Sequence, residues 1–141
     1  MKILKIFFKL LVLFLIGGFV YYGIELLWRG WSHWSMFILG GLCFVIIGGL
    51  NEYYGWDMPL WKQCVIGALV ITGLELACGL LVNKALGWAV WDYSTMPFNL
   101  WGQVCLPYTG LWVLLSGVAV FVDDWLRYWL FKEEKPHYKL F

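Results

Sequence analysis

Charged side chains are scarce in this sequence. Asp, Glu, Lys and Arg account for 13% of the 141 residues, whereas a soluble domain carries roughly 25%. Such a chain has too few charges to cover a surface that faces water on all sides. Its formal net charge of +1 also lacks the dense positive surface that nucleic-acid binding requires, so we predict no nucleic-acid partner.

Sequence signatures for several kinds of chemistry are also missing. The four cysteines form no CxxC pair and no cluster with histidine, so neither a zinc site nor a disulfide framework is indicated. The chain has no P-loop motif for ATP hydrolysis and no GxSxG or HExxH motif of a hydrolase or metalloprotease. We therefore predict no metal and no cofactor, and we favour a non-enzymatic function over an enzymatic one.

Apolar side chains dominate instead. They make up 62% of the sequence, and the 11 tryptophans suit a membrane–water boundary, where an indole N–H stays wet. Four apolar runs predict a single all-α membrane domain, a polytopic bundle of about four transmembrane helices. The first run begins like a signal peptide, but no small-residue cleavage site follows it, so we interpret it as a retained helix. The predicted spans are about 5–28, 34–50, 61–83 and 104–125.

The parts outside these spans indicate an orientation. Residues 88–101 contain five aromatic side chains, so we predict a segment at the outer membrane interface, with Asp92 capping a short helix. Residues 126–141 form the predicted cytoplasmic tail. With both chain ends in the cytoplasm, eight basic residues lie inside and only Arg29 and Lys84 lie outside, which is the bias that the positive-inside rule predicts.

The third span carries one acid, Glu75. At 100° per residue, Glu75 shares a helical face of about 100° with small and polar residues, namely Cys64, Ala68, Thr72, Gly79 and Asn83. Insertion scales penalise a carboxyl in lipid by roughly 2.5–3.5 kcal/mol, so we expect this face to point into the bundle. Glu75 then either hydrogen-bonds a neighbouring helix as a packing contact or forms a substrate, ion or proton site.

Polar residues near the outer ends of other spans are further candidates. Glu25, Arg29 and His33 follow one another at intervals of four and share one face if the first helix continues. They either anchor the helix end through a salt bridge or converge with Glu75 on one polar chamber. Two residues of the aromatic segment are expected near the outer end of the same chamber, Asp92 and Asn99.

Other positions predict helix packing rather than a binding site. Gly41 and Gly48 lie seven residues apart on one face of the second span, and small residues at such spacing allow two helices to approach closely. Asp123 and Arg127 are spaced for an ion pair on one helix, which we predict at the membrane interface.

A longer pattern connects the third and fourth spans. An acid within the membrane is followed by Trp-Asp-Tyr-Ser, Pro-x-Asn, Gly-x-x-Cys-Leu and a further Trp. These are Glu75, Trp91 to Ser94, Pro97, Asn99, Gly102, Cys105, Leu106 and Trp112. The pattern resembles the family "Putative ABC-transporter type IV", a group of small bacterial membrane proteins often labelled permeases, and the match is mainly over residues 75–112. Residues 29–36 depart from it, because the family has a Gly-Pro-x-x-Pro-Ile-Tyr-Gly segment there.

The resemblance implies a multi-pass protein of the bacterial cytoplasmic (inner) membrane, and it allows a separate ATPase as a partner. The distribution of basic residues gives its orientation as N-in and C-in. Four helices in a lipid bilayer barely enclose a pathway, so we expect a homo-oligomer or a partner membrane subunit. Our leading hypothesis is a permease-like transport protein or transporter subunit with a polar site around Glu75. Two alternatives stay open: a small intramembrane enzyme acting on lipid or isoprenoid through Glu75 or Asp92, and an assembly or accessory protein without a site.

Overall fold

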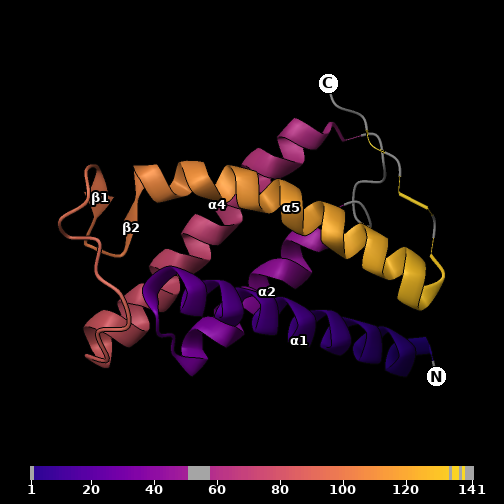
Figure 1. Cartoon of the computed structure of the whole chain (residues 1–141), viewed down its shortest axis with the longest axis horizontal. Coiled ribbons are helices and arrows are strands. Elements are labelled where there is room, and N and C mark those ends of the chain that lie inside the picture. The colour runs from indigo at the N-terminus through magenta and orange to yellow at the C-terminus, as the bar shows by residue number, and fades with distance from the viewer. Residues whose placement is uncertain (1, 51–57, 134, 137, 139–141) are drawn as a thin grey trace.

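The computed structural model of the chain describes residues 2–50, 58–133, 135, 136 and 138. These residues form four α-helices, a π-helical turn that continues the third of them, and one two-stranded hairpin (Figure 1). The elements are α1 (Lys2–Arg29), α2 (Trp34–Gly48), α4 (Leu60–Gly79), η1 (Leu80–Ala85), β1 (Asn99–Leu100), β2 (Val104–Cys105) and α5 (Leu106–Phe131).

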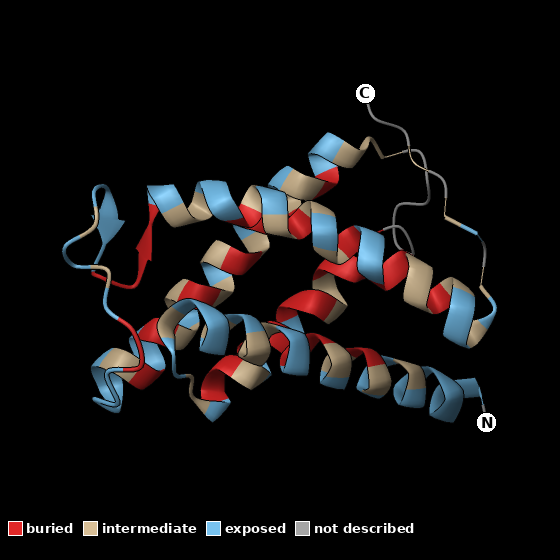
Figure 2. Cartoon of the chain, viewed as in Figure 1, coloured by how far each residue is buried: buried red, intermediate tan, exposed pale blue. Residues whose placement is uncertain are grey.

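The helices have the length and surface of membrane spans. α1, α4 together with η1, and α5 are each long and apolar enough to cross a bilayer. α2 is apolar but shorter, since its 15 residues rise by only about 22 Å against the roughly 30 Å of a hydrocarbon core. Large apolar side chains such as Leu27 and Leu114 are exposed, as a lipid-facing surface requires. Figure 2 shows exposed residues along the outer sides of the helices. The chain is an all-α membrane bundle, which confirms the predicted fold class.

The last helix begins later than the predicted span. Residues 104–105 form strand β2, which pairs antiparallel with β1, and α5 therefore starts at Leu106. Pro107 lies in the first turn of the helix, where its missing N–H costs least.

The last helix also continues beyond residue 125, through the first part of the predicted tail. It ends at Phe131, where Lys132 adopts a left-handed conformation (φ 56°) and donates its N–H to the carbonyl of Arg127. Lys139, which we counted among the inside basic residues, lies outside the described residues.

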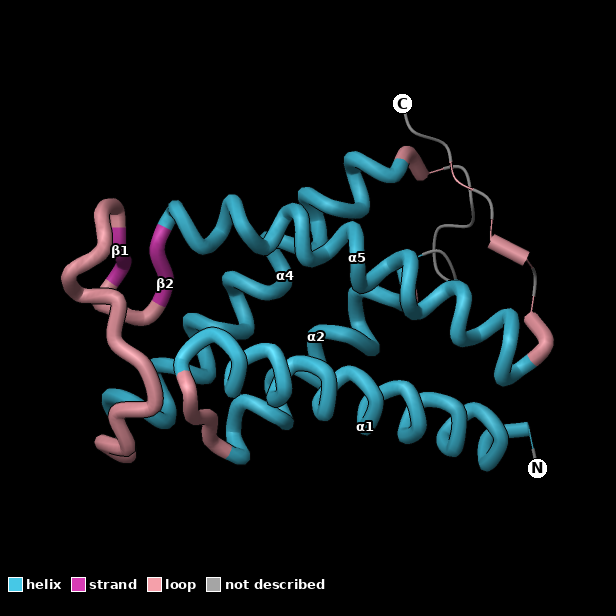
Figure 3. Tube along the Cα trace, in the orientation of Figure 1, coloured by secondary structure: helices cyan, strands magenta, loops and turns pink. Residues whose placement is uncertain are grey.

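The helices are arranged as two pairs joined through α2. α1 packs mainly against α2, α4 packs mainly against α5, and α2 also contacts α4 and α5. In Figure 1 and in the Cα trace of Figure 3, α1 and α5 run in opposite directions along the longest axis, and α2 and α4 cross at an angle to them. The start of α1 and the end of α5 therefore lie at one end of the bundle, where Lys9 Nζ lies 2.9 Å from Glu133 Oε2.

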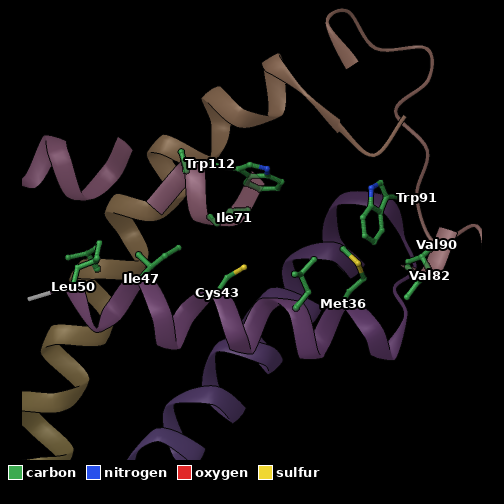
Figure 4. Packing of buried hydrophobic residues seen from close by; sticks show 12 residues of the cluster. Met36, Cys43, Ile47, Leu50, Ile71, Val82, Val90, Trp91 and Trp112 are labelled. Atoms are coloured by element: carbon green, nitrogen blue, oxygen red, sulfur yellow. The ribbon is translucent and has the colours of Figure 1, made fainter. Parts of the chain in front are cut away.

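The buried apolar core follows α2. Met36, Cys43 and Ile47 of this helix are buried and form the centre of the cluster. Figure 4 shows Trp91, from the segment after η1, close to Met36, while Trp112 of α5 lies farther along the helix. The aromatic segment is thus folded into the bundle at Trp91 rather than extended away from it.

Glycines allow the helices to approach closely. Gly17 of α1 lies against the Phe44 side chain of α2, and a Cβ added at Gly41 would lie 2.6 Å from the carbonyl oxygen of Phe14. Gly48, nearer the end of α2, lies against Asp123 of α5 instead. The predicted packing role of Gly41 and Gly48 is confirmed, and the two glycines serve different partner helices.

The ion pair predicted on the last helix is present and is buried within the protein. Arg127 Nε lies 2.7 Å from Asp123 Oδ2, and the two side chains are 5% and 0% exposed. The predicted pairing is therefore confirmed, and its location at the membrane interface stays a prediction. The small residue Gly48 leaves room on α2 for the Asp123 carboxylate, which draws the pair into the protein.

The close contact between α1 and α2 can be tested with two glycines of α1. We expect Gly17→Leu to lower the free energy of unfolding by roughly 1–3 kcal/mol, because the new side chain overlaps Phe44. Gly23→Leu is the matched control, since a Cβ added there has no neighbouring atom within 4 Å. Thermal unfolding of the purified variants in detergent measures the difference, and equal melting temperatures for the two would contradict this packing.

Candidate functional site

The Glu75 carboxyl is buried where three parts of the chain meet. Its side chain projects from α4 and the residue is 1% exposed. The Tyr93 hydroxyl donates a hydrogen bond to Glu75 Oε2 at 3.1 Å, and Trp112 Nε1 of α5 donates a longer one to Oε1 at 3.4 Å. Within the described part of the chain the carboxyl has two neutral donors and no acceptor as partners, which suits an acid that accepts hydrogen bonds through both oxygens.

The face of α4 that carries Glu75 points into the bundle, as its small and polar residues predicted. Ala68, Glu75 and Gly79 are buried on this face, whereas Leu69 on the opposite side is 63% exposed. The face packs against α5, where the Thr72 and Thr109 hydroxyls share a hydrogen bond of 3.0 Å.

Two adjoining cavities, which together we call the chamber, lie between the α1–α2 pair and the α4–α5 pair. The inner cavity, of about 120 Å³, is lined by Glu75 and mostly by apolar side chains, Cys43 and Phe44 among them. The outer cavity, of about 360 Å³, is lined by Glu25, Arg29 and several aromatic rings. Both cavities share five lining residues: Tyr21, Ile24, Trp112, Leu115 and Val118.

Glu25 and Arg29 form an ion pair in the outer cavity. Arg29 Nε lies 2.7 Å from Glu25 Oε2, and the two side chains are 23% and 13% exposed. Arg29 also donates from Nη1 to the carbonyl of Val90 at 2.9 Å and lies over the Trp31 ring. The pair thus anchors the end of α1 through a salt bridge, which was one of the two roles that we predicted for it. The pair lines the outer cavity and Glu75 lines the inner one, so their convergence on one polar site stays a prediction.

The other predicted site residues do not line these cavities. His33 caps α2, because its Nδ1 accepts the N–H of Ser35 at 3.1 Å. Asn99 closes a loop by donating to the carbonyl of Met96 and accepting the N–H of Gly102. Contact of these residues, or of the exposed Asp92, with a ligand stays a prediction.

Asp92 has a local role in the backbone. Its Oδ1 accepts the N–H of Ser94 at 2.8 Å, and this backbone hydrogen bond holds the pKa of the Asp92 carboxyl below its usual range. The prediction of a short helix after Asp92 was wrong, because residues 94–95 form a turn and the chain continues to β1 without a helix.

The segment between η1 and β1 is held over the chamber by a polar network. Asn83 donates to Gln103 Oε1 at 2.7 Å and accepts the N–H of Val90 at 2.7 Å. Trp91 Nε1 donates to the carbonyl of Gln103 at 2.9 Å. These contacts fix the backbone on either side of Trp91, so that Tyr93 reaches Glu75.

Sequence reasoning named neither Tyr93 nor Trp112 as a site residue. Both belong to the motif between residues 75 and 112, so the motif itself carried the signal that was missed. Burial raises the pKa of the Tyr93 hydroxyl well above its usual range, and the Glu75 carboxyl raises it further. Tyr93 therefore stays protonated near neutral pH and remains a donor to Glu75.

The comparison with known families covers nearly the whole chain. The family model "Putative ABC-transporter type IV" matches residues 12–138. The chain belongs to this family. The match of this type IV family member therefore extends well beyond residues 75–112, over which we saw the resemblance. Residues 29–36 differ from the family pattern only locally. No curated protein and no solved structure matches the chain.

The motif residues of this type IV family member divide into two groups in the structure. Glu75, Tyr93 and Trp112 meet in the buried site, whereas Asp92 and Asn99 bind backbone groups of the connecting segment. One group therefore forms the site and the other folds the segment that completes it.

Proposed function

We propose that this protein is a permease-like membrane transport protein, or the membrane subunit of a transporter, with its substrate site in the chamber. The observation that carries the proposal is Glu75, an acid almost fully buried in a membrane helix and lining a cavity. A carboxyl in such a position is unfavourable and typically marks a path for an ion, a proton or a substrate. The family description supports the same class of function.

The chamber gives its polar residues different roles in this proposal. Glu75 binds a cation or a proton in the inner cavity, and its two donors hold the carboxyl in a fixed position. Glu25 and Arg29 lie farther out, where Arg29 can pair with an anionic group of a substrate. The enzyme hypothesis is weaker because Asp92, its second candidate acid, lines neither cavity.

Flux into vesicles tests transport across several classes of solute. Purified protein is reconstituted into liposomes that enclose a pH indicator and a membrane-potential dye, and amines, organic anions and sugars are added one class at a time. We expect at least one class to move protons or charge faster than in protein-free liposomes. A wild-type protein that moves none of these classes would contradict transport by this chain alone and would leave only its proposed role as the membrane subunit of a transporter.

We also propose that a second copy or a partner membrane subunit completes the pathway, and that a separate ATPase binds the cytoplasmic end. The support is geometric, because α1 and α5 each pack mainly on one neighbour and leave the chamber open on one side. Size-exclusion chromatography with light scattering in detergent measures the number of copies.

The orientation that we propose is N-in and C-in, in the bacterial inner membrane. Both ends of the described chain lie at one end of the bundle, which supports a topology with both on the same side of the membrane (Figure 1). The basic residues then favour the cytoplasm for that side.

Cysteine labelling in intact cells tests this orientation. In a variant without the four native cysteines, a membrane-impermeant thiol reagent is expected to label Lys84→Cys but not Lys135→Cys. Both positions are exposed, so access depends only on the side of the membrane. Labelling at both positions would indicate dual topology, and labelling at Lys135→Cys alone would indicate the reverse orientation.

A further inference from the structure

Aromatic rings line the outer cavity, and two of them, Tyr21 and Trp112, also line the inner cavity together with Glu75. Tyr93 stacks on Tyr108, with ring centroids 4.9 Å apart and planes 12° apart, and Tyr108 lies 5.9 Å from the Trp112 ring. Six aromatic residues line the outer cavity: Tyr21, Trp28, Trp91, Tyr93, Tyr108 and Trp112 (Figure 4 shows Trp91 and Trp112). Their π faces attract cations, and the attraction increases where water is excluded.

The charges that line the chamber leave one acid unbalanced. Glu25 and Arg29 pair with each other. Glu75 has only the neutral donors Tyr93 and Trp112, and no cation among the described residues pairs with it. A carboxylate has about four lone-pair positions, of which these donors use two. The chamber therefore has a net attraction for a positive charge beside Glu75.

The chamber opens onto the apolar outer surface of the bundle. Four residues that line it are also largely exposed on the apolar outer surface: Val20, Ile24, Leu114 and Val118. They belong to α1 and α5, so an apolar molecule can pass from the lipid between these two helices. A strongly hydrated ion would lose its water along this route, at a large energetic cost.

We infer that the chamber binds a lipophilic organic cation, with its positive centre between Glu75 and the aromatic rings and its apolar groups against the chamber walls. A quaternary ammonium or phosphonium ion fits because a negative charge and π faces stabilise it and it needs no coordinating oxygen atoms. A metal ion fits less well, since no group of three His, Cys, Asp or Glu side chains gathers in the described part of the chain. The inference rests on the proposed site and names its substrate class.

Equilibrium binding to the wild-type protein is the first test. Radiolabelled tetraphenylphosphonium and tetraphenylborate, which have nearly the same shape and opposite charge, are dialysed against the full chain in detergent in separate experiments. We expect saturable binding of the phosphonium, and at least 100-fold weaker binding of the borate after correction for partition into detergent. Equal binding of the two ions would overturn the inference, because shape and apolarity alone would then explain binding.

A charge-matched pair of variants locates the site. Glu75→Gln is expected to weaken phosphonium binding at least tenfold, whereas Glu133→Gln, which removes one acid at the far end of the bundle, changes it less than twofold. Size-exclusion profiles show whether both variants are folded. If Glu75→Gln does not fold, the comparison of phosphonium and borate binding to the wild-type protein tests the inference instead. Unchanged binding by folded Glu75→Gln would also overturn the inference.

This binding assay is independent of movement across a membrane. Phosphonium binding without flux of any solute would contradict transport and leave the ligand class intact. Flux of another solute class without phosphonium binding would contradict the ligand class alone.

Discussion

Glu75→Gln is expected to reduce solute-driven flux to the level of protein-free liposomes while leaving the protein folded. Gln has nearly the shape of Glu and can still accept one of the two hydrogen bonds from Tyr93 and Trp112, so we expect a loss of stability of about 1–3 kcal/mol for the one donor that is left unpaired. It cannot release a proton or balance a cation. Flux into liposomes and thermal unfolding in detergent are measured on the same preparation.

Glu75→Leu separates a functional acid from a packing contact. Leu removes the acceptor and leaves the Tyr93 hydroxyl and the Trp112 N–H unpaired, at about 1–3 kcal/mol for each buried donor. We therefore expect a lower melting temperature for Leu than for Gln. If Gln retains full flux and only Leu is impaired, Glu75 is a packing contact and the proposed site is wrong. Glu133→Gln again serves as the charge-matched control.

Arg127→Met is expected to destabilise the protein by roughly 3–5 kcal/mol. It removes the cation that lies 2.7 Å from the Asp123 carboxylate beside Gly48, and breaking a buried ion pair by removing one partner is among the most costly changes in a protein. Thermal and denaturant-induced unfolding in detergent measure this loss.

Two further variants test whether the loss of stability in Arg127→Met comes from breaking the buried ion pair. The double variant Asp123→Leu/Arg127→Met removes both charges, so we expect it to be more stable than Arg127→Met alone. Lys9→Met breaks the more exposed Lys9–Glu133 pair at the same end of the bundle, and we expect a cost of about 1 kcal/mol or less. A double variant no more stable than the single one would contradict a buried ion pair as the source.

The features that could be predicted from the sequence are those that depend on near neighbours in the chain. Helix periodicity set which face of α4 carries Glu75, because residues three and four apart share a face. The Glu25–Arg29 and Asp123–Arg127 pairs followed from the same spacing. Composition alone determined a membrane bundle, since so few charges cannot cover a water-facing surface.

The partners of these residues depended on contacts between distant parts of the chain. Tyr93 and Trp112 lie 18 and 37 residues after Glu75, and helical spacing carries no information about such pairs. Gly48 buries Asp123 only because α2 crosses α5 at that point. The sequence by itself determined that an acid points into a membrane bundle. Only the packing of α1, α2, α4 and α5 decided that this acid lines an aromatic chamber, because side chains from all four helices form its walls.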